Sequence, residues 1–463
     1  MAERLARLTI LALLGGCAVG PDYERPPLDV PDHYLQSDVQ PASTDPSIAN
    51  LDWWELFDDP ELEALIRAAL ANNKELAIAV ARIDEAAAVL GIVRADQFPV
   101  LNAEGSAGRI SNSEDLIPFA ETRDDYFLGA SAAFEIDLWG KLRRATEGAR
   151  ADLLGSEETA RAVTISLVAE VATTYFLLRD LDHRYQVATR TLTSREDSLD
   201  IIRARFDKGI VPELDVNQAD VEAADAQASI AAFERQVIQI ENALRVLIGA
   251  NPGAVTRGLP LDRQTVPVDV PAGLPVTLLE RRPDVRAAEQ AFAAATARIG
   301  VARALRLPSL GLTGSYGSAT DDFDNLLDNA SEQWDFFGSI FAPIFNAGQL
   351  KAQEHAQIAR AEQARLDYEL TVLSALQDVE DALTAIRTFR AEHAARLRQL
   401  AAAQTAARLS RARYDGGIVS YLEVLDTERS LFQSELLESS TRQQSLTAVV
   451  QLYRALGGGW SAQ

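Results

Sequence analysis

The sequence predicts an α+β membrane protein built from an internally duplicated unit of helix, β-hairpin, long helix and helix. Three observations predict this class. Two long stretches free of proline carry apolar residues at helical spacing, and segments with period-two alternation lie between helices in each half. Four short motifs of the first half return in order in the second half, about 208 residues later, which indicates a repeat. The repeated motifs begin at Gly91 and Gly300, Phe98 and Leu307, Trp139 and Ala347, and Arg205 and Arg413.

The N-terminal residues 1–16 are expected to be a signal peptide, because a basic start precedes an apolar core too short to span a bilayer. Cys17 is the only cysteine and follows the small residues Gly15 and Gly16. This arrangement resembles a bacterial lipobox, which implies cleavage before Cys17 and acylation of it. Because residue 18 is Ala and not Asp, the same resemblance implies sorting to the outer membrane. The alternative is an ordinary secretory signal with an incidental cysteine.

An extended arm and the first repeat follow the signal. Recurrent prolines predict an arm over residues 17–60. The first repeat spans residues 61–249. Its expected elements are a helix at about 61–96, strands at about 99–110 and 126–137, a long helix at about 141–208 and a helix at 212–248. At 1.5 Å per residue the long helix would reach roughly 100 Å, which points to coiled-coil packing.

A second proline-rich stretch, residues 250–282, predicts an irregular connector between the repeats. The second repeat spans residues 283–456, and residues 457–463 form a tail. The elements expected in the second repeat are a helix from 283, strands at about 309–318 and 334–345, a long helix at about 348–415 and a helix at 420–456.

The segment 126–137 shows the clearest alternation of apolar and polar residues, and 309–318 repeats it. These segments have the length of tilted strands in an outer membrane, with one face toward lipid. The alternative is two soluble hairpins, each with one wet face. Glu135, Asp137 and Asp335 are expected on or near inward positions, where they would favour cations in a pore.

The turns after the two long helices are the predicted functional tips. Glycine suits the end of a helix, Pro212 suits the start of the next, and Ser420 with Glu423 forms a capping-box pattern. Apolar residues at the far end of a long helix indicate docking to a partner, or else they hold the two helices together. The candidate docking residues are Gly209, Ile210, Val211, Gly417, Ile418 and Val419.

Carboxylates cluster beside both tips. If several copies of the chain surround one axis, such residues form acidic rings suited to gating. The alternative is that they only cap helices and face solvent. The candidate gate residues are Asp207, Asp215, Asp415, Glu423 and Asp426.

The composition excludes several classes of protein. A net charge of −24 disfavours nucleic acid as a partner. One cysteine and four histidines provide neither a thiolate metal cluster nor a disulfide framework, and no metal or cofactor is expected. The sequence contains no Walker, zincin or nucleophile-elbow motif, so we do not expect an enzyme. No uninterrupted apolar run of about 18 residues occurs, so no transmembrane helix is expected either.

Several motifs along the chain resemble outer-membrane efflux lipoproteins of the OprM and NodT type, within the TolC superfamily of outer membrane factors. The motifs are Cys17-Ala-Val-Gly20-Pro21-Asp22-Tyr23-Glu-Arg-Pro26, Trp53-Trp54-x-x-Phe57-x-Asp59-Pro60, Asp137-Leu138-Trp139-Gly140-Lys141, Arg281-Arg282-Pro283-Asp284-Val285 and Tyr453-Arg454-Ala455-Leu456-Gly457-Gly458-Gly459-Trp460. Arg281 to Asp284 are expected to be structural, at a helix start.

The resemblance implies a homotrimer whose chains each give four strands to a 12-stranded barrel and helices to a long periplasmic tunnel. It also implies a tripartite efflux system for small molecules such as drugs. The partners would be a periplasmic adaptor protein and an inner-membrane transporter, of the resistance-nodulation-division type. Two alternatives are a type I protein-secretion duct of the same fold and a structural coiled-coil lipoprotein without a pore.

Overall fold

A computed structural model describes residues 18–32, 34–35, 57–111, 122–265 and 278–458. The signal peptide, Cys17, Trp53 and Trp54 lie outside the described residues. The chain divides into two compact units, each assembled from three stretches of sequence. The first unit contains residues 1–27, 81–157 and 287–369, and the second contains residues 28–80, 158–286 and 370–463.

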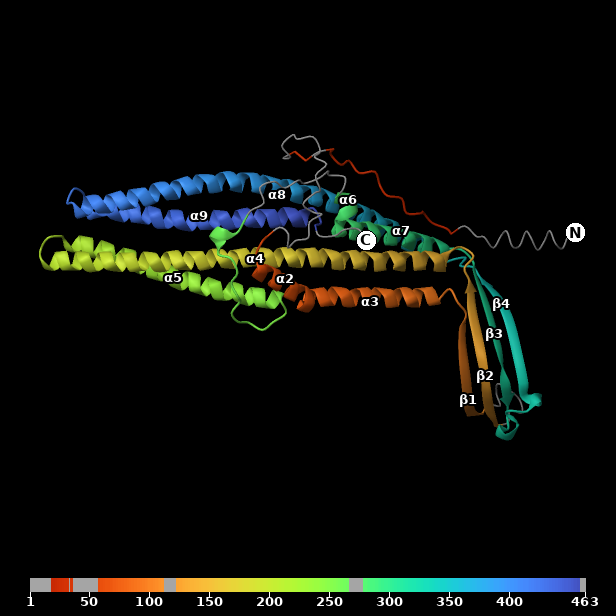
Figure 1. Cartoon of the computed structure of the whole chain (residues 1–463). Coiled ribbons are helices and arrows are strands. Elements are labelled where there is room, and N and C mark those ends of the chain that lie inside the picture. Colours follow the sequence, from red (N-terminus) through yellow and green to blue (C-terminus); the bar gives the residue numbers. More distant parts are fainter. Residues whose placement is uncertain (1–17, 33, 36–56, 112–121, 266–277, 459–463) are drawn as a thin grey trace. The chain divides into compact units, whose positions relative to one another are not determined.

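The first unit is built on a four-stranded antiparallel sheet in the order β1-β2-β3-β4 (Figure 1). The strands are β1 (Val100–Ile110), β2 (Arg123–Ile136), β3 (Ser309–Thr320) and β4 (Glu332–Phe341). Within the described residues, β1 and β4 each keep one edge without a partner strand. Parts of the helices α3 (Lys74–Ala95), α4 (Lys141–Asp207), α7 (Pro283–Ala304) and α8 (Gln349–Asp415) complete this unit.

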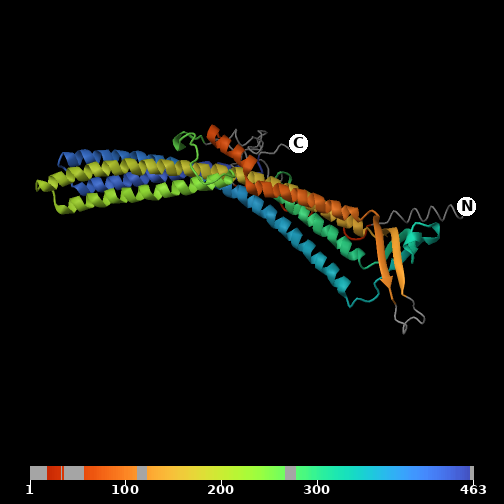
Figure 2. The same ribbon diagram turned by 90° about the horizontal axis from the view of Figure 1, so that it is seen from below.

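The second unit contains two long helical hairpins that lie side by side (Figure 2). One pairs α4 with α5 (Glu213–Leu247), and the other pairs α8 with α9 (Tyr421–Ala455). Val187 and Ala188 of α4 pack on Phe432 of α9, with Ile230 and Phe233 of α5 around them. The hairpins are therefore joined by a shared apolar core.

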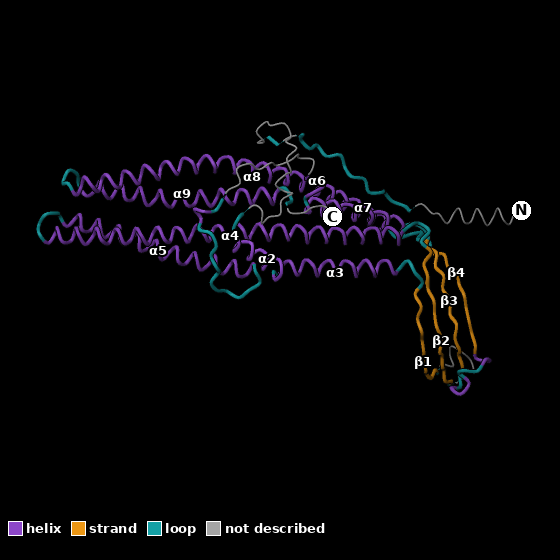
Figure 3. Tube along the Cα trace, viewed as in Figure 1, coloured by secondary structure: helices purple, strands orange, loops and turns teal. Residues whose placement is uncertain are grey.

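The elements follow each other in the same order in both halves of the chain (Figure 3). The long helices and the strands lie within about three residues of the sequence expectation, except that β4 ends at Phe341, before Pro343. The expected single helix at 61–96 is wrong. It is two helices, α2 (Pro60–Asn72) and α3, because Asn73 caps both of them.

The Asn73 side chain accepts a hydrogen bond from the Leu76 N–H at 2.9 Å and donates one to the Leu247 carbonyl at 2.9 Å. The first bond starts α3, and the second ties the break to the end of α5. Such a cap satisfies backbone groups that a helix end leaves unpaired.

Asp59 begins α2 and is almost fully buried. Its carboxylate accepts hydrogen bonds from the Tyr175 hydroxyl at 2.7 Å, the Leu259 N–H at 3.1 Å and the Gln264 amide at 2.6 Å. A Cβ on Gly258 would lie 2.0 Å from the carboxylate, so only glycine fits there. Asp59 thus joins α2, α4 and the connector.

Arg282 begins α7 and has the structural role that the sequence predicts. Its guanidinium donates to Asp284, to Asp378 of α8 at 3.0 Å and to the carbonyl of Ala455 at 3.0 Å. The side chain is buried, and charge-assisted bonds of this kind are strong. One residue therefore ties the start of α7 to both helices of the second hairpin.

Candidate functional site

Both tips end their long helix in the same way. Gly209 and Gly417 each have φ +69°, in the left-handed region. At the first tip, the N–H of Ile210 donates to the carbonyl of Arg205 at 2.9 Å, and the N–H of Gly209 donates to Phe206 at 2.7 Å. The second tip repeats both bonds, at 2.9 Å each. This pair of bonds is a Schellman motif, which favours glycine at the position with positive φ.

The apolar tip residues divide into packed and exposed groups. Val211 packs against the core cluster that joins the two hairpins. This contact fits the alternative in which the residue holds helices together. Val419 is half-buried. In contrast, the side chains of Ile210 and Ile418 are 66% and 71% exposed.

Sequence reasoning missed two further exposed residues at the tips. Leu214 is 62% exposed and Leu422 is 56% exposed. Each lies four residues after an exposed isoleucine, and the two are 208 residues apart, as Ile210 and Ile418 are. The repeat offset was the signal that could have found them. Each tip therefore presents one isoleucine and one leucine to solvent.

The gate candidates also differ in their surroundings. Asp207, Asp415 and Asp426 are exposed, and Asp215 is half-buried. Glu423 accepts a hydrogen bond from Arg413 at 2.9 Å. The capping box expected at this position is wrong, because the side chain of Ser420 makes no capping hydrogen bond.

Behind the tips, a layer of ion pairs joins the hairpins. Buried Arg195 of α4 contacts Glu222 of α5 at 3.0 Å, and Arg429 of α9 pairs with the same carboxylate. Arg411 of α8 donates to the Ser198 hydroxyl of α4 at 2.8 Å. Breaking one member of a buried pair is costly, so this layer opposes separation of the hairpins.

The sheet has one apolar and one polar face, which follow from the register of its strands. The large apolar residues of the apolar face are Leu101, Tyr126, Leu128, Phe134, Ile136, Leu310, Leu312, Tyr316, Trp334, Phe336 and Ile340. At the end of the sheet away from the helices, the same face carries Arg109, Asp124, Ser318, Thr320 and Glu332. The residues of the polar face include Asn102, Glu104, Ser106, Ser131, Glu135, Thr313, Ser315, Gln333, Asp335 and Ser339. Phe127, Phe337 and Phe341 also lie on the polar face.

The three carboxylates expected near a pore have different partners. Lys141 contacts Glu135 at 2.6 Å, and Ser315 donates to Asp335. Asp137 accepts from the N–H groups of Leu142 at 3.1 Å and Arg143 at 3.0 Å, so it caps the first turn of α4. Sequence reasoning missed Glu104, which lies on the polar face and accepts from Ser131.

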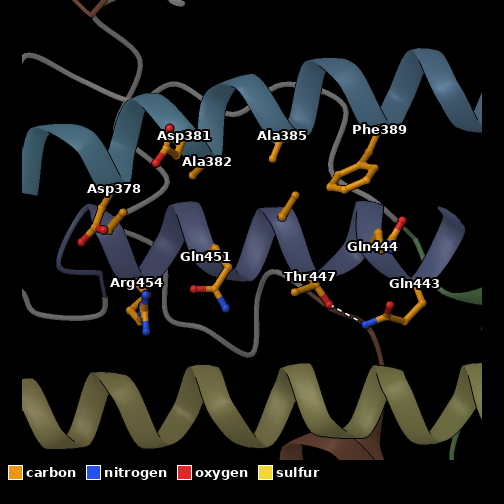
Figure 4. A pocket seen from close by; sticks show the side chains of 12 residues that line it. Asp378, Asp381, Ala382, Ala385, Phe389, Gln443, Gln444, Thr447, Gln451 and Arg454 are labelled. Carbon is orange, nitrogen blue, oxygen red and sulfur yellow. Dashed lines mark hydrogen bonds between the residues drawn. The ribbon is translucent and has the colours of Figure 1, made fainter. Parts of the chain in front are cut away.

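A groove of about 410 Å³ lies between α8 and α9 (Figure 4). Ala382 and Ala385 of α8 and Ala448 of α9 form part of its lining, together with Phe389. Its polar lining residues include Asp381, Gln443, Gln451 and Arg454. Among the described residues no three side chains of His, Cys, Asp or Glu are grouped to hold a metal ion.

One helix among the described residues, α4, has an 18-residue window with mean hydropathy 1.4, apolar enough by composition to cross a membrane. The sequence expectation considered only uninterrupted apolar runs and missed this window. Of this window, 44% is buried inside the protein.

The family model of outer membrane efflux proteins matches residues 65–250 and 274–458, once in each half of the duplication. The solvent efflux pump outer membrane protein SrpC of Pseudomonas putida is 38% identical over 97% of this chain and 97% of its own length. The cation efflux system protein CusC of Escherichia coli is 34% identical over 99% of each chain.

The solved structures show the same similarity. The open state of the MtrE outer membrane channel of Neisseria gonorrhoeae superimposes with a TM-score of 0.86 at 32% identity. The alignment covers 96% of this chain and 98% of the MtrE chain.

Proposed function

Because the chain belongs to the outer membrane efflux protein family and is an outer-membrane efflux channel, we propose that three copies form the exit duct of a tripartite pump. In this proposal each chain gives four strands to a 12-stranded barrel and its helices to a periplasmic tunnel. The duct is passive and catalyses no reaction. Its energy comes from an inner-membrane transporter, of the resistance-nodulation-division type, through a periplasmic adaptor.

The sheet is the observation that carries this proposal. Its apolar face suits lipid and its polar face suits a water-filled lumen. A lone four-stranded sheet leaves backbone groups unpaired at β1 and β4, and a bilayer does not tolerate unpaired backbone groups. Because the strands alternate in direction, β4 of one copy would run antiparallel to β1 of the next.

The names of two relatives support a proposal for the cargo. SrpC is named as the outer membrane protein of a solvent efflux pump, and CusC is named as a protein of a cation efflux system. We propose small molecules as the cargo class of this duct, selected by the pump and the adaptor.

The tips are the proposed docking surface for the adaptor. Ile210, Leu214, Ile418 and Leu422 would enter apolar pockets on it, since exposed apolar side chains mark interaction sites. Gly209 and Gly417 set the turns that present these side chains. Val211 and Val419 would support the tip from behind. The exposed carboxylates Asp207, Asp415 and Asp426 would line the resting gate, with Asp215 and Glu423 beside them.

A cysteine cross-link tests the proposed barrel. Asn102 of β1 and Ser339 of β4 both lie on the polar face, two residues from the helix-side ends of the outer strands. Oxidation of the double variant Asn102→Cys, Ser339→Cys should therefore give a covalent trimer on a denaturing gel, and the purified protein should conduct ions in a planar bilayer. Ser131 is the partner of Asn102 within one chain, so Asn102→Cys with Ser131→Cys should remain monomeric on the gel. Monomers from the first variant, or a protein without conductance, would contradict the proposed duct.

A further inference from the structure

Residues 18–25 of the N-terminal arm pack directly on the helices and the strand end of the first unit. The N–H of Val19 donates to the carbonyl of Trp139 at 2.9 Å, between β2 and α4. Gly20 has φ +107°, and a Cβ on it would lie 2.5 Å from the Cα of Gly300 in α7. A Cβ on Gly140 would lie 2.7 Å from Ala18. Only glycine allows these backbones to approach so closely.

Two charged contacts hold the next residues of the arm. Asp22 pairs with Arg144 of α4 at 2.5 Å. Tyr23 donates to Glu289 of α7 at 2.9 Å, and Arg25 donates to both oxygens of the same carboxylate, at 2.8 and 2.7 Å. The ring of Tyr23 also meets Phe292 edge-on, with centroids 5.4 Å apart.

Glu289 gives these contacts their specificity. The residue is only 7% exposed, and the hydrogen bonds that the described structure gives its carboxylate come from Tyr23 and Arg25. If the arm left, the carboxylate would lose its bidentate arginine and the tyrosine hydroxyl, and charge-assisted hydrogen bonds of this kind are strong. Burial and the Glu289 contact also raise the pKa of Tyr23, so its hydroxyl remains a donor.

We propose that residues 18–25 are a clamp that fixes the acylated N-terminus to the junction of β2 and α4, so that the acyl chains enter the bilayer at a set depth beside the sheet. The proposal rests on the acylation of Cys17 proposed from the sequence. Neighbouring Cα atoms are about 3.8 Å apart, so the Cα of Cys17 can lie no further than that from the Cα of Ala18. Without the clamp, the lipid anchor would be a flexible tether that does not orient the subunit.

A nitroxide label on Pro21→Cys tests the clamp in the mature, full-length protein in phosphatidylcholine vesicles. Cys17 is the only native cysteine and its thiol would carry lipid, so position 21 would hold the single free thiol. We expect an immobilised spectrum and one membrane depth, near the head groups, from collision with oxygen and a nickel chelate. With Glu289→Gln added, we expect the mobile fraction to rise about tenfold, because the charged pair with Arg25 is lost.

Glu354→Gln is the matched control. Glu354 is as buried as Glu289 and pairs with Arg303 and Arg306, but not with the arm, so the label should stay immobile. The arm variant Tyr23→Phe, Arg25→Met leaves the helices unchanged and should release the label as Glu289→Gln does. A label that is mobile in the Pro21→Cys protein itself would overturn the clamp. So would a label that stays immobile both with Glu289→Gln and with Tyr23→Phe, Arg25→Met. Mass spectrometry of the N-terminal peptide reports acylation separately, so failure of the lipid assignment is distinguishable from failure of the clamp.

Discussion

Gly209 and Gly417 have identical φ angles in the two halves of the chain, and no atom would lie within 4 Å of an added Cβ at either position. Space therefore does not require glycine there. The backbone conformation does, because a left-handed residue with a branched side chain is strained. A substitution at either glycine should therefore strain the turn without disturbing the packing of neighbouring side chains.

Replacing Gly417 by Val tests the second tip at the level of one residue. The β-branched side chain should cost about 1–2 kcal/mol in the left-handed conformation and distort the turn that presents Ile418. We expect impaired export and lower resistance while trimers still form, measured as drug susceptibility at equal protein level. Wild-type susceptibility in this strain would remove the tip from the docking role.

Asp415 tests the proposed gate. Its side chain is exposed, so Asp415→Ala should leave the tip folded and remove one carboxylate from the proposed ring. We expect a higher conductance of the isolated duct in planar bilayers. Unchanged conductance would leave Asp415 with only a capping and solvating role.

The sequence predicted the tip glycines from their position after a long helix, but it did not separate Ile210 from Val211. Neighbouring residues at a turn point in different directions, and only the packing of the second hairpin decides which one is covered. The capping box expected from Ser420 and Glu423 is wrong for a similar reason, because Glu423 has another partner. Its partner Arg413 lies across the turn, outside the capping-box pattern.

Among the elements, the first turns of α5 and α9 carry the second pair of exposed tip residues, Leu214 and Leu422. The double change Ile418→Ser, Leu422→Ser should weaken adaptor binding by about tenfold or more, since truncating two central apolar contacts each costs more than 1 kcal/mol. Binding of the purified adaptor to the duct would measure this. Val221→Ser, on an equally exposed residue of α5 beyond the tip, is the control and should bind normally. Equal affinity of both variants would contradict the docking surface.

The helices and strands could largely be predicted, because the sequence shows apolar residues at a spacing of three to four in the helices and of two in the strands. The break at Asn73 could not, since the cap depends on the Leu247 carbonyl, which is distant in sequence. β1 was also less clear than β2. Its glycines and alanines hide the alternation, and Glu104 was missed although it faces the same side as Glu135.

For the whole molecule, the lumen should prefer cations. The mature charge would be near −25, because residues 1–16 carry two arginines and one glutamate. Lys141 offsets Glu135, and Asp137 caps α4. The polar face then keeps the carboxylates of Glu104, Asp125 and Asp335, with Arg123 at its end away from the helices. Reversal potentials in a salt gradient should show cation selectivity, reduced by Glu104→Gln with Asp335→Asn. Anion selectivity of the unchanged protein would contradict this orientation of the sheet.

The need for several copies could be argued from the sequence, because four strands do not close a barrel. The number three could not, since nothing within one chain encodes the rotation between copies. That number came from resemblance to known channels, and the cross-link between β1 and β4 tests it.

The two unpaired strand edges also bear on how subunits polymerise. An interface that joins β4 of one copy to β1 of the next is head-to-tail, so every added copy exposes a fresh edge. If the rotation per copy closes, growth stops at a ring. If the sheet flattens, the same edges propagate an open fibre. The rotation between neighbouring copies therefore limits the size of the assembly. Variants that flatten the sheet would turn a finite assembly into an aggregate without altering a contact residue at the edges.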